Sequence, residues 1–198
     1  IRDWARSRGI GDENKRQTYF NPLIDQLTKF YNADDIEPIE FYGNCYNGNA
    51  DLYTTMSYLP HVDTFPGADK DINPLNDYAF NLNVTKSDKV KTAFYSFNGK
   101  KSVCDWTPDD YDDHDRVRDR HKKIKAKDWR LLSSENFQNY QLEYVANIEY
   151  NSLILYPSHY WHSVYIKEDW FTDTDRVTFT GFFETKTTSS KRKKLGFG

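Results

Sequence analysis

Short runs of alternating apolar and polar residues, separated by turn residues, dominate the sequence beyond its first fifty residues. The run 78–84 alternates Tyr, Phe, Leu and Val with Ala and Asn, which is typical of a strand with one buried face. The run 90–97 ends at Asn98-Gly99, a strong turn signal. Short strands at this spacing predict an antiparallel barrel or a double-sheet jelly roll. Further strands are predicted at 52–59, 144–148, 152–156, 162–166 and 177–184.

One amphipathic helix is predicted near the start of the chain. Asn21-Pro22 resembles a cap followed by a proline in the first helical turn. Apolar residues follow at helical spacing as far as Tyr31, which gives an apolar stripe about three turns long. The fold class predicted from these patterns is mainly β with an N-terminal helix.

Composition narrows the class of protein further. A chain of 198 residues is most simply one domain, and aromatic residues make up 17% of it, enough to build a core. The net charge of −3 argues against a nucleic-acid partner, which needs a basic surface. No apolar run reaches the roughly 18 residues that span a bilayer, so no membrane partner is expected.

Two features bear on the compartment of the protein. No signal-peptide pattern is visible in a chain that begins at Ile1. The two cysteines, Cys45 and Cys104, are too few for a disulfide framework, although one disulfide remains an alternative. Two reduced thiols in a cytoplasmic protein are the expectation.

A charged segment interrupts the strand pattern at 105–128, where a run of aspartates gives way to arginines and lysines. Such a block predicts a solvated loop or an exposed helix, and the alternative is a lid over the mouth of the barrel. The predicted single domain, 1–185, then consists of an N-terminal helical region, 1–44, and a β core, 45–185. Residues 186–198 are expected to form a flexible basic tail.

His61-Val62-Asp63 offers an imidazole and a carboxylate two positions apart. In an extended segment both side chains project to one face, with Cα atoms ~7 Å apart, while Val62 points away. A third donor, His162, begins a predicted strand about a hundred residues later. Two imidazoles and one carboxylate can cover one face of an Fe(II) ion and leave the other face open to substrates.

The choice of the distal histidine rests on local structure. His162 follows an apolar strand and a turn, and it would need a partner or a metal if it pointed inward. His159 is the competing ligand, but it lies in the turn itself and is expected to face solvent.

Arg176 begins the last predicted strand and shares a face with Thr178 and Thr180. An inward-facing guanidinium needs an anion, and it can form two parallel hydrogen bonds to a carboxylate, with Thr178 adding a hydroxyl. The alternative is an ordinary salt bridge to Asp173 or Asp175. Arg176 and Thr178 are therefore candidate ligands of an anionic co-substrate.

The order of these motifs resembles that of the Fe(II)- and 2-oxoglutarate-dependent dioxygenases, and in particular the prolyl-4-hydroxylase-like group with its phage and marine bacterial members. The similarity covers roughly residues 45–185. The segments that carry it are 58–63 (Y-x-x-H-x-D), 81–83 (N-L-N), 92–95 (T-A-F-Y), 150–157 (Y-N-S-L-I-L-Y-P) and 161–163 (W-H-S).

The resemblance implies a double-stranded β-helix of the jelly-roll or cupin type that holds Fe(II) through His61, Asp63 and His162. 2-Oxoglutarate would chelate the iron through its keto acid end, and its far carboxylate would bind Arg176 and Thr178. O₂ would be the second co-substrate, and succinate would be released.

Two further residues are implied to contact 2-oxoglutarate. Tyr58 leads into the metal motif, and Asn81 stands where the group commonly has a tyrosine that binds the co-substrate. Asn81 and the Val90-Lys91 pair, which replaces the usual two glycines, are departures from the group's pattern.

Several outcomes stay open from the sequence. The presence of Asp63 favours hydroxylation over halogenation, because halogenases of this superfamily lack the carboxylate ligand. A jelly-roll binding or structural module without turnover is the alternative function. A peptide side chain or a small molecule is the expected substrate, and a phage-encoded protein in the host cytoplasm is the expected setting.

Overall fold

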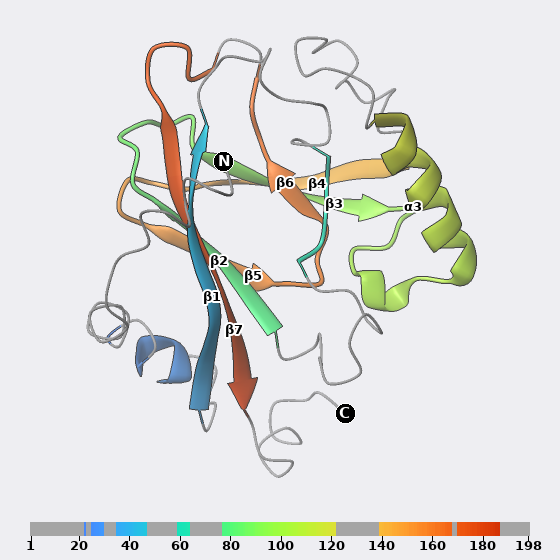
Figure 1. The fold of residues 1–198 in the computed structure, drawn as a ribbon, viewed down its shortest axis with the longest axis horizontal. Coiled ribbons are helices and arrows are strands. Elements are labelled where there is room, and N and C mark those ends of the chain that lie inside the picture. Colours follow the sequence, from blue (N-terminus) through green and yellow to red (C-terminus); the bar gives the residue numbers. More distant parts are fainter. Residues whose placement is uncertain are drawn as a thin grey trace.

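Seven strands and one long helix make up most of the chain that the computed structural model describes (Figure 1). The described residues are Pro22, 25–29, 35–46, 59–63, 77–121, 139–167 and 170–186. The strands are β1 (Asp35–Tyr46), β2 (Asp77–Asn83), β3 (Lys91–Phe97), β4 (Tyr140–Asn147), β5 (Leu153–Pro157), β6 (His162–Val164) and β7 (Arg176–Lys186). A 3₁₀ turn, η3 (Val103–Asp105), and the helix α3 (Pro108–His121) lie between β3 and β4.

The strands form two sheets, one with the order β1-β7-β2-β5 and one with the order β4-β3-β6. Every strand pair in the described residues is antiparallel. Strand β7 lies inside the first sheet, where it pairs with β1 on one side and with β2 on the other. The two sheets meet where Tyr156 of β5 packs edge-on against Phe94 of β3, with ring centroids 5.2 Å apart.

His61 extends the second sheet by a single residue. It forms an isolated antiparallel bridge with His162 of β6, in which each backbone N–H donates to the other carbonyl, at 2.8 and 2.9 Å. In chain order, the segments then fall in the first sheet (β1), the second (His61), the first (β2), the second (β3, β4), the first (β5), the second (β6) and the first (β7). Such crossing between two antiparallel sheets is consistent with the predicted jelly roll.

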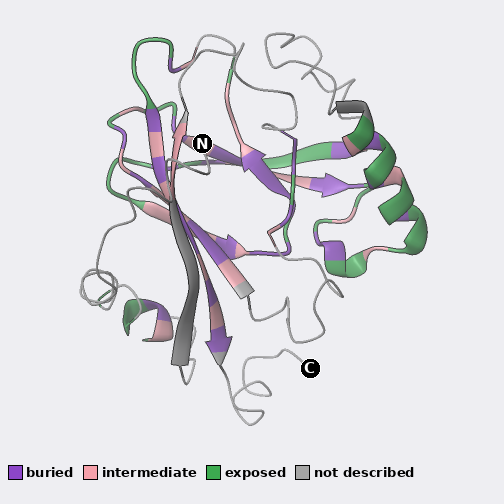
Figure 2. Ribbon diagram, viewed as in Figure 1, coloured by how far each residue is buried: buried purple, intermediate pink, exposed green. Residues whose placement is uncertain are grey.

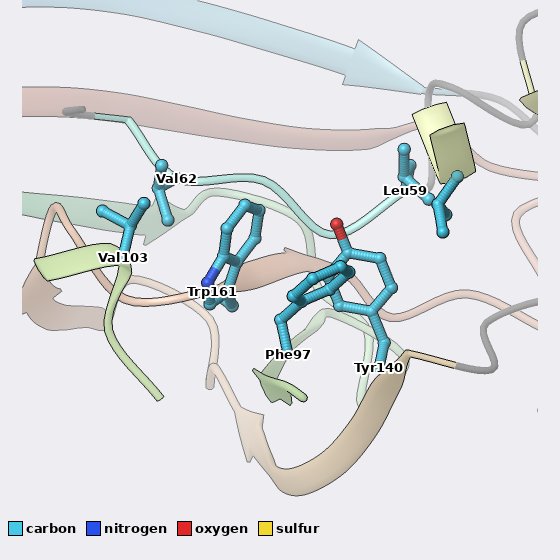
Figure 3. Packing of buried hydrophobic residues seen from close by; sticks show 7 residues of the cluster. Leu59, Val62, Phe97, Val103, Tyr140 and Trp161 are labelled. Atoms are coloured by element: carbon cyan, nitrogen blue, oxygen red, sulfur yellow. The ribbon is translucent and has the colours of Figure 1, made fainter. Parts of the chain in front are cut away.

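An aromatic core supports the second sheet and the segment that carries His61. Trp161, which is fully buried, stacks on Trp106 with ring centroids 4.8 Å apart. Burying a large apolar side chain contributes about 1.5–3 kcal/mol, so this cluster is a main source of stability. Its buried members, most of them labelled in Figure 3, are Leu59, Val62, Phe97, Val103, Val117, Tyr140 and Trp161.

Helix α3 occupies the first part of the charged segment 105–128. Its inner side contributes Val117 to the aromatic core, and His114 packs on Trp161 with ring centroids 5.1 Å apart. Its outer side is exposed (Figure 2). The described part is therefore a solvated helix docked on the core, and residues 122–128 lie outside the described residues.

One half of a capping box begins α3. The Thr107 backbone N–H and hydroxyl both donate to Asp110 Oδ2, each at 2.7 Å, and the Lys100 ammonium pairs with the same oxygen. Burial raises the pKa of Asp110, but these bonds and one from Asn98 outweigh it, so the net pKa lies well below the usual 3.8. The carboxylate is thus held in its charged form by the folded state.

Asp110→Asn is expected to lower the free energy of unfolding at pH 7 by about 1–3 kcal/mol, because the donors to this buried side chain lose a charged acceptor. A lowered folded pKa stabilises the protein above the usual pKa of 3.8, and this contribution is lost as the pH falls through the folded value. The stability gap between parent and variant should therefore narrow below about pH 4. Urea unfolding at pH 7 and pH 3 measures both gaps.

Asp109→Asn is the matched control, since Asp109 is exposed in the same helical turn. Its effect should stay below about 1 kcal/mol, the range of an exposed charge near a helix N-terminus. Equal destabilisation by the two variants, or a gap that does not change with pH, would contradict the role given to Asp110.

Four predicted strands match β2, β3, β5 and β7, with ends shifted by two residues at most. β4 begins four residues before the predicted 144, and β6 ends two residues before the predicted 166. Of the predicted strand 52–59, only Leu59 lies within the described residues.

Strand β1 was not foreseen, and it begins inside the region 1–44 that was expected to be helical. Its sequence contains Pro38, which falls at an irregularity in the pairing with β7. A proline and nearby glutamates have low strand propensity, so the local sequence does not predict a strand here. The strand forms because it pairs with β7.

The predicted N-terminal helix is described only in part, at Pro22 and at 25–29, where the backbone is helical. Leu27 is buried there and packs with Phe80 and Phe183 of the first sheet. The other residues of the predicted helix lie outside the described residues.

Across the part of the chain that the structure describes, no helix has the length and apolarity to cross a membrane. Cys45 and Cys104 carry free thiols.

Candidate metal centre

Three side chains from distant parts of the chain converge on one point. One nitrogen or oxygen from each of His61, Asp63 and His162 lies within 4.8 Å of the others. His61 Nε2 is 3.8 Å from Asp63 Oδ1, and His162 Nε2 is 3.4 Å from Asp63 Oδ2. This spacing suits three donors around one ion at about 2 Å each.

The backbone holds this triad in place. The bridge between His61 and His162 sets the two histidines side by side, with ring centroids 4.5 Å apart. The Asp63 N–H donates to Ser158 O at 2.9 Å, and Val62 is buried in the aromatic core between them. The extended segment predicted around His61 forms only a single bridge, to β6. The side chains of residues 61 and 63 nevertheless lie on one face.

Hydrogen bonds to backbone carbonyls orient both imidazoles. His162 Nδ1 lies 2.9 Å from Tyr160 O, and His61 Nδ1 lies 3.4 Å from Leu59 O. Since a carbonyl only accepts, these contacts assign the ring hydrogen to Nδ1 in each histidine. The Nε2 lone pairs are then left to point toward Asp63, as a metal-ligating histidine requires.

The atoms that the three side chains turn toward one another can all accept hydrogen bonds, but none of them can donate one. Among the described residues no hydrogen-bond donor reaches the buried Asp63 Oδ2. Burial raises the pKa of Asp63 to about 6, an effect that the nearby His61 partly offsets. Two imidazole lone pairs and a carboxylate facing one another are stabilised by a cation, so the residues present fit a divalent metal ion.

The three members differ in exposure. The His162 side chain is 5% exposed and that of Asp63 is 11% exposed. Burial lowers the pKa of His162 to about 4. Desolvation and then the His162 ring lower the pKa of His61, although 56% of that side chain is accessible. The site therefore opens to solvent beside His61.

Asp63→Asn is expected to stabilise the metal-free protein at pH 8 by about 1–3 kcal/mol, the usual cost of an unsatisfied buried polar group. The asparagine is uncharged, and its amide can donate to a histidine Nε2 where the carboxylate cannot. Thermal unfolding with a chelator present measures the change. The exposed Asp88→Asn is the control, and it should shift stability by no more than about 0.5 kcal/mol. A less stable Asp63→Asn protein would contradict the acceptor cluster.

Arg176 and Thr178 occupy buried positions at the start of β7. Arg176 Nη1 donates to Thr178 Oγ1 at 3.3 Å. Burial alternates along the strand, so Arg176, Thr178 and Thr180 share the inner face, as predicted. The alternative partners Asp173 and Asp175 are both exposed.

The other predicted residues have separate outcomes. Asn81 is half-buried on β2 and makes hydrogen bonds to Thr180 and Tyr156. Tyr58 lies outside the described residues. His159 is buried, so the expectation that it faces solvent is wrong, and within the described chain it is not part of the converging set. The turn 158–160 folds inward because its backbone bonds to residues 63 and 103.

Tyr156 packs its ring on His162, with centroids 4.6 Å apart. The sequence places this residue in an apolar strand and in the segment 150–157 that carries the resemblance, but no role in the site was predicted for it. A tyrosine with a polar tip, placed shortly before the distal histidine, is the signal that was available in the sequence.

Comparisons with known proteins give a likeness of fold. No protein-family model matches the sequence, and no curated protein matches it. The chain is similar to the crystal structure of SnoN, a non-heme alpha-ketoglutarate-dependent epimerase from nogalamycin biosynthesis, with 12% identity and a TM-score of 0.51. That match covers 89% of this chain and 59% of SnoN. The chain thus spans less than two thirds of SnoN.

A second similar structure is iron-bound HygX from Streptomyces hygroscopicus, with 12% identity and a TM-score of 0.48, covering 88% of this chain and 70% of HygX. HygX with nickel and 2-oxoglutarate bound matches with a TM-score of 0.39 and 12% identity, covering 82% and 63% of the two chains.

Proposed function

We propose that this chain is an Fe(II)- and 2-oxoglutarate-dependent oxygenase that hydroxylates a C–H bond and releases succinate and CO₂. The observation that carries the proposal is the convergence of His61 Nε2, the Asp63 carboxylate and His162 Nε2 on one point. Two imidazoles and one carboxylate leave three cis positions on Fe(II) for reactants, whereas a four-cysteine site would be closed.

The protein residues have distinct tasks in this proposal. His61, Asp63 and His162 hold the metal, and the exposed side of His61 is the entrance. Arg176 and Thr178 bind the far carboxylate of 2-oxoglutarate from the inner face of β7. When bound, the iron and its co-substrates 2-oxoglutarate and O₂ supply the oxidative chemistry, and the chain orients the substrate.

The likeness of fold to SnoN supports this assignment, since SnoN is described as a non-heme, alpha-ketoglutarate-dependent enzyme. SnoN is an epimerase, so the likeness supports the cofactor class rather than the reaction. Hydroxylation is proposed from the carboxylate ligand Asp63 and from the motif order, which favours the prolyl-4-hydroxylase-like group of phages and marine bacteria. A peptide side chain or a small molecule in the cytoplasm is the proposed substrate, because a net charge of −3 disfavours nucleic acid.

Succinate release tests the proposal. Purified protein is incubated with Fe(II), 2-oxoglutarate and O₂, and succinate is quantified by mass spectrometry. The expected result is slow succinate formation that requires all three reactants and is lost in the His162→Ala protein. Iron binding through the triad without succinate formation, with or without a panel of amino acids and peptides, would support the alternative of a binding module without turnover.

A further inference from the structure

A row of side-chain hydrogen bonds crosses the whole first sheet. Asn44 of β1 donates from Nδ2 to Thr180 Oγ1 of β7 at 2.8 Å. Thr180 donates from Oγ1 to Asn81 Oδ1 of β2 at 2.6 Å. Asn81 donates from Nδ2 to the Tyr156 hydroxyl of β5 at 3.0 Å. Each strand contributes one residue, in the order in which the strands pair.

The donors and acceptors of this row run in one direction. The Thr180 hydroxyl accepts from Asn44 and donates to Asn81, and the Asn81 amide accepts on its oxygen and donates from its nitrogen. These contacts fix the orientation of the amide and of the hydroxyl. Hydrogen bonds linked in this way polarise and strengthen one another where the dielectric is low. Thr180 and Tyr156 are both buried, so the row stiffens the inner face of the sheet.

The row ends against the candidate metal ligand. The Tyr156 ring lies 4.6 Å from the His162 ring, tilted by 55°, and Phe94 packs on Tyr156 from the second sheet. His162 Nδ1 is held by Tyr160 O on its other side. The direction of the His162 Nε2 atom therefore depends on the backbone contact and on the rings around the imidazole, which are those of Tyr156, His61 and Phe94.

We infer that the row Asn44–Thr180–Asn81–Tyr156 is a positioning device for His162. The hydrogen bonds hold the Tyr156 ring, and this ring holds the imidazole so that Nε2 faces Asp63. The inference deepens the proposed function, because it rests on His162 being a metal ligand. It assigns Asn81 a role that acts through Tyr156, in addition to any contact with a co-substrate. Partners one step beyond the ligands commonly set metal affinity.

Two substitutions at Tyr156 separate the ring from its hydroxyl. Tyr156→Phe keeps the ring but breaks the last bond of the row, and the Mn²⁺ affinity should fall by about 10-fold. Tyr156→Leu removes the ring, and a loss of about 100-fold is expected. Titration calorimetry with Mn²⁺ measures both. Tyr144→Phe is the matched control, since Tyr144 is 64% exposed on β4, and it should bind as the parent does.

A pair at Thr180 tests the row at a distance from the metal. Thr180→Val removes the hydroxyl, whereas Thr180→Ser keeps it, so the serine variant should retain parental Mn²⁺ affinity and the valine variant should lose about 10-fold. Adding Thr180→Val to Tyr156→Phe should cause little further loss of Mn²⁺ affinity, because both substitutions interrupt the same row of hydrogen bonds. The visible absorption of bound Co²⁺, which reports ligand geometry, should change in every variant that weakens Mn²⁺.

Proton NMR of the metal-free protein supplies a readout that needs no metal. The His162 Nδ1–H signal, identified by its loss in His162→Ala, should broaden in Tyr156→Leu as the ring loses its contact. Parental Mn²⁺ affinity, Co²⁺ spectrum and Nδ1–H signal in the folded Tyr156 variants would overturn the inference and leave the proposed function standing. A parent protein that binds no metal would overturn the proposed function, and the inference with it, whatever the NMR signal shows.

Discussion

The His162→Ala protein should bind Mn²⁺ more than ~100-fold more weakly than the parent, since substitutions one step beyond a ligand already cost 10- to 100-fold. His162 Nε2 lies 3.4 Å from Asp63 Oδ2, and it is the most buried donor of the triad. Its removal leaves two protein ligands, so one of the three bonds that compete with the hydration shell of the ion is lost. Titration calorimetry with Mn²⁺ under anaerobic conditions measures the loss.

His159→Ala is the matched control for this result. His159 was the competing ligand, it is buried like His162, and it lies in the turn just before β6. Its replacement is expected to lower stability but to leave Mn²⁺ affinity within about threefold of the parent's in the protein that remains folded. The assignment of the distal ligand would be wrong if His159→Ala lost metal affinity and His162→Ala retained it.

The Arg176→Ala protein should bind 2-oxoglutarate ~30- to ~4,000-fold more weakly, because truncating one partner of a buried charge pair costs about 2–5 kcal/mol. Arg176 is buried at the start of β7, where its Nη1 contacts the Thr178 hydroxyl. Without the guanidinium, the far carboxylate of the co-substrate would be buried without a cation. Calorimetric titration of the Mn²⁺-loaded protein with 2-oxoglutarate measures the change.

Three comparisons sharpen this prediction. Arg176→Lys keeps the charge but loses the two-pronged geometry, and it should bind 2-oxoglutarate more weakly than the parent. Thr178→Val should cause a smaller loss, of roughly 10-fold, because one hydrogen bond is removed and the guanidinium charge stays in place. Arg116→Ala, on the exposed side of α3, should have no effect on the affinity. Unchanged 2-oxoglutarate affinity in both Arg176 variants would exclude the role proposed for this residue.

Local patterning was enough to predict most strands of the fold. The alternation at 78–84 and the turn at Asn98-Gly99 correspond to β2 and to the end of β3. It failed at β1, where Pro38 interrupts the pattern and pairing with β7 forms the strand. It also left open whether the charged segment is a loop, a helix or a lid, because charge alternation does not reveal that Val117 and His114 pack on Trp161.

The candidate site, like the strands, could be predicted from local patterns only in part. The spacing of His61 and Asp63 predicts a shared face, and both side chains do point to one place. The exposure of His159 was predicted wrongly, since a turn that would ordinarily face solvent is pulled inward by backbone bonds to distant segments. No role was predicted for Tyr156, because its contact with His162 joins the two sheets and is not visible in the pattern of its own strand.

By itself, the sequence determined the kind of donors available, their spacing within each strand and the face of the strand on which each would lie. These follow from the two-residue period of extended backbone, which is a local property. Only the tertiary structure decided that His61 and His162 form a bridge and that both Nδ1 atoms meet carbonyls. It also decided that four polar side chains line up across β1, β7, β2 and β5. Strand pairing joins segments more than a hundred residues apart, as between β1 and β7, and its register is set by the packing of the whole domain.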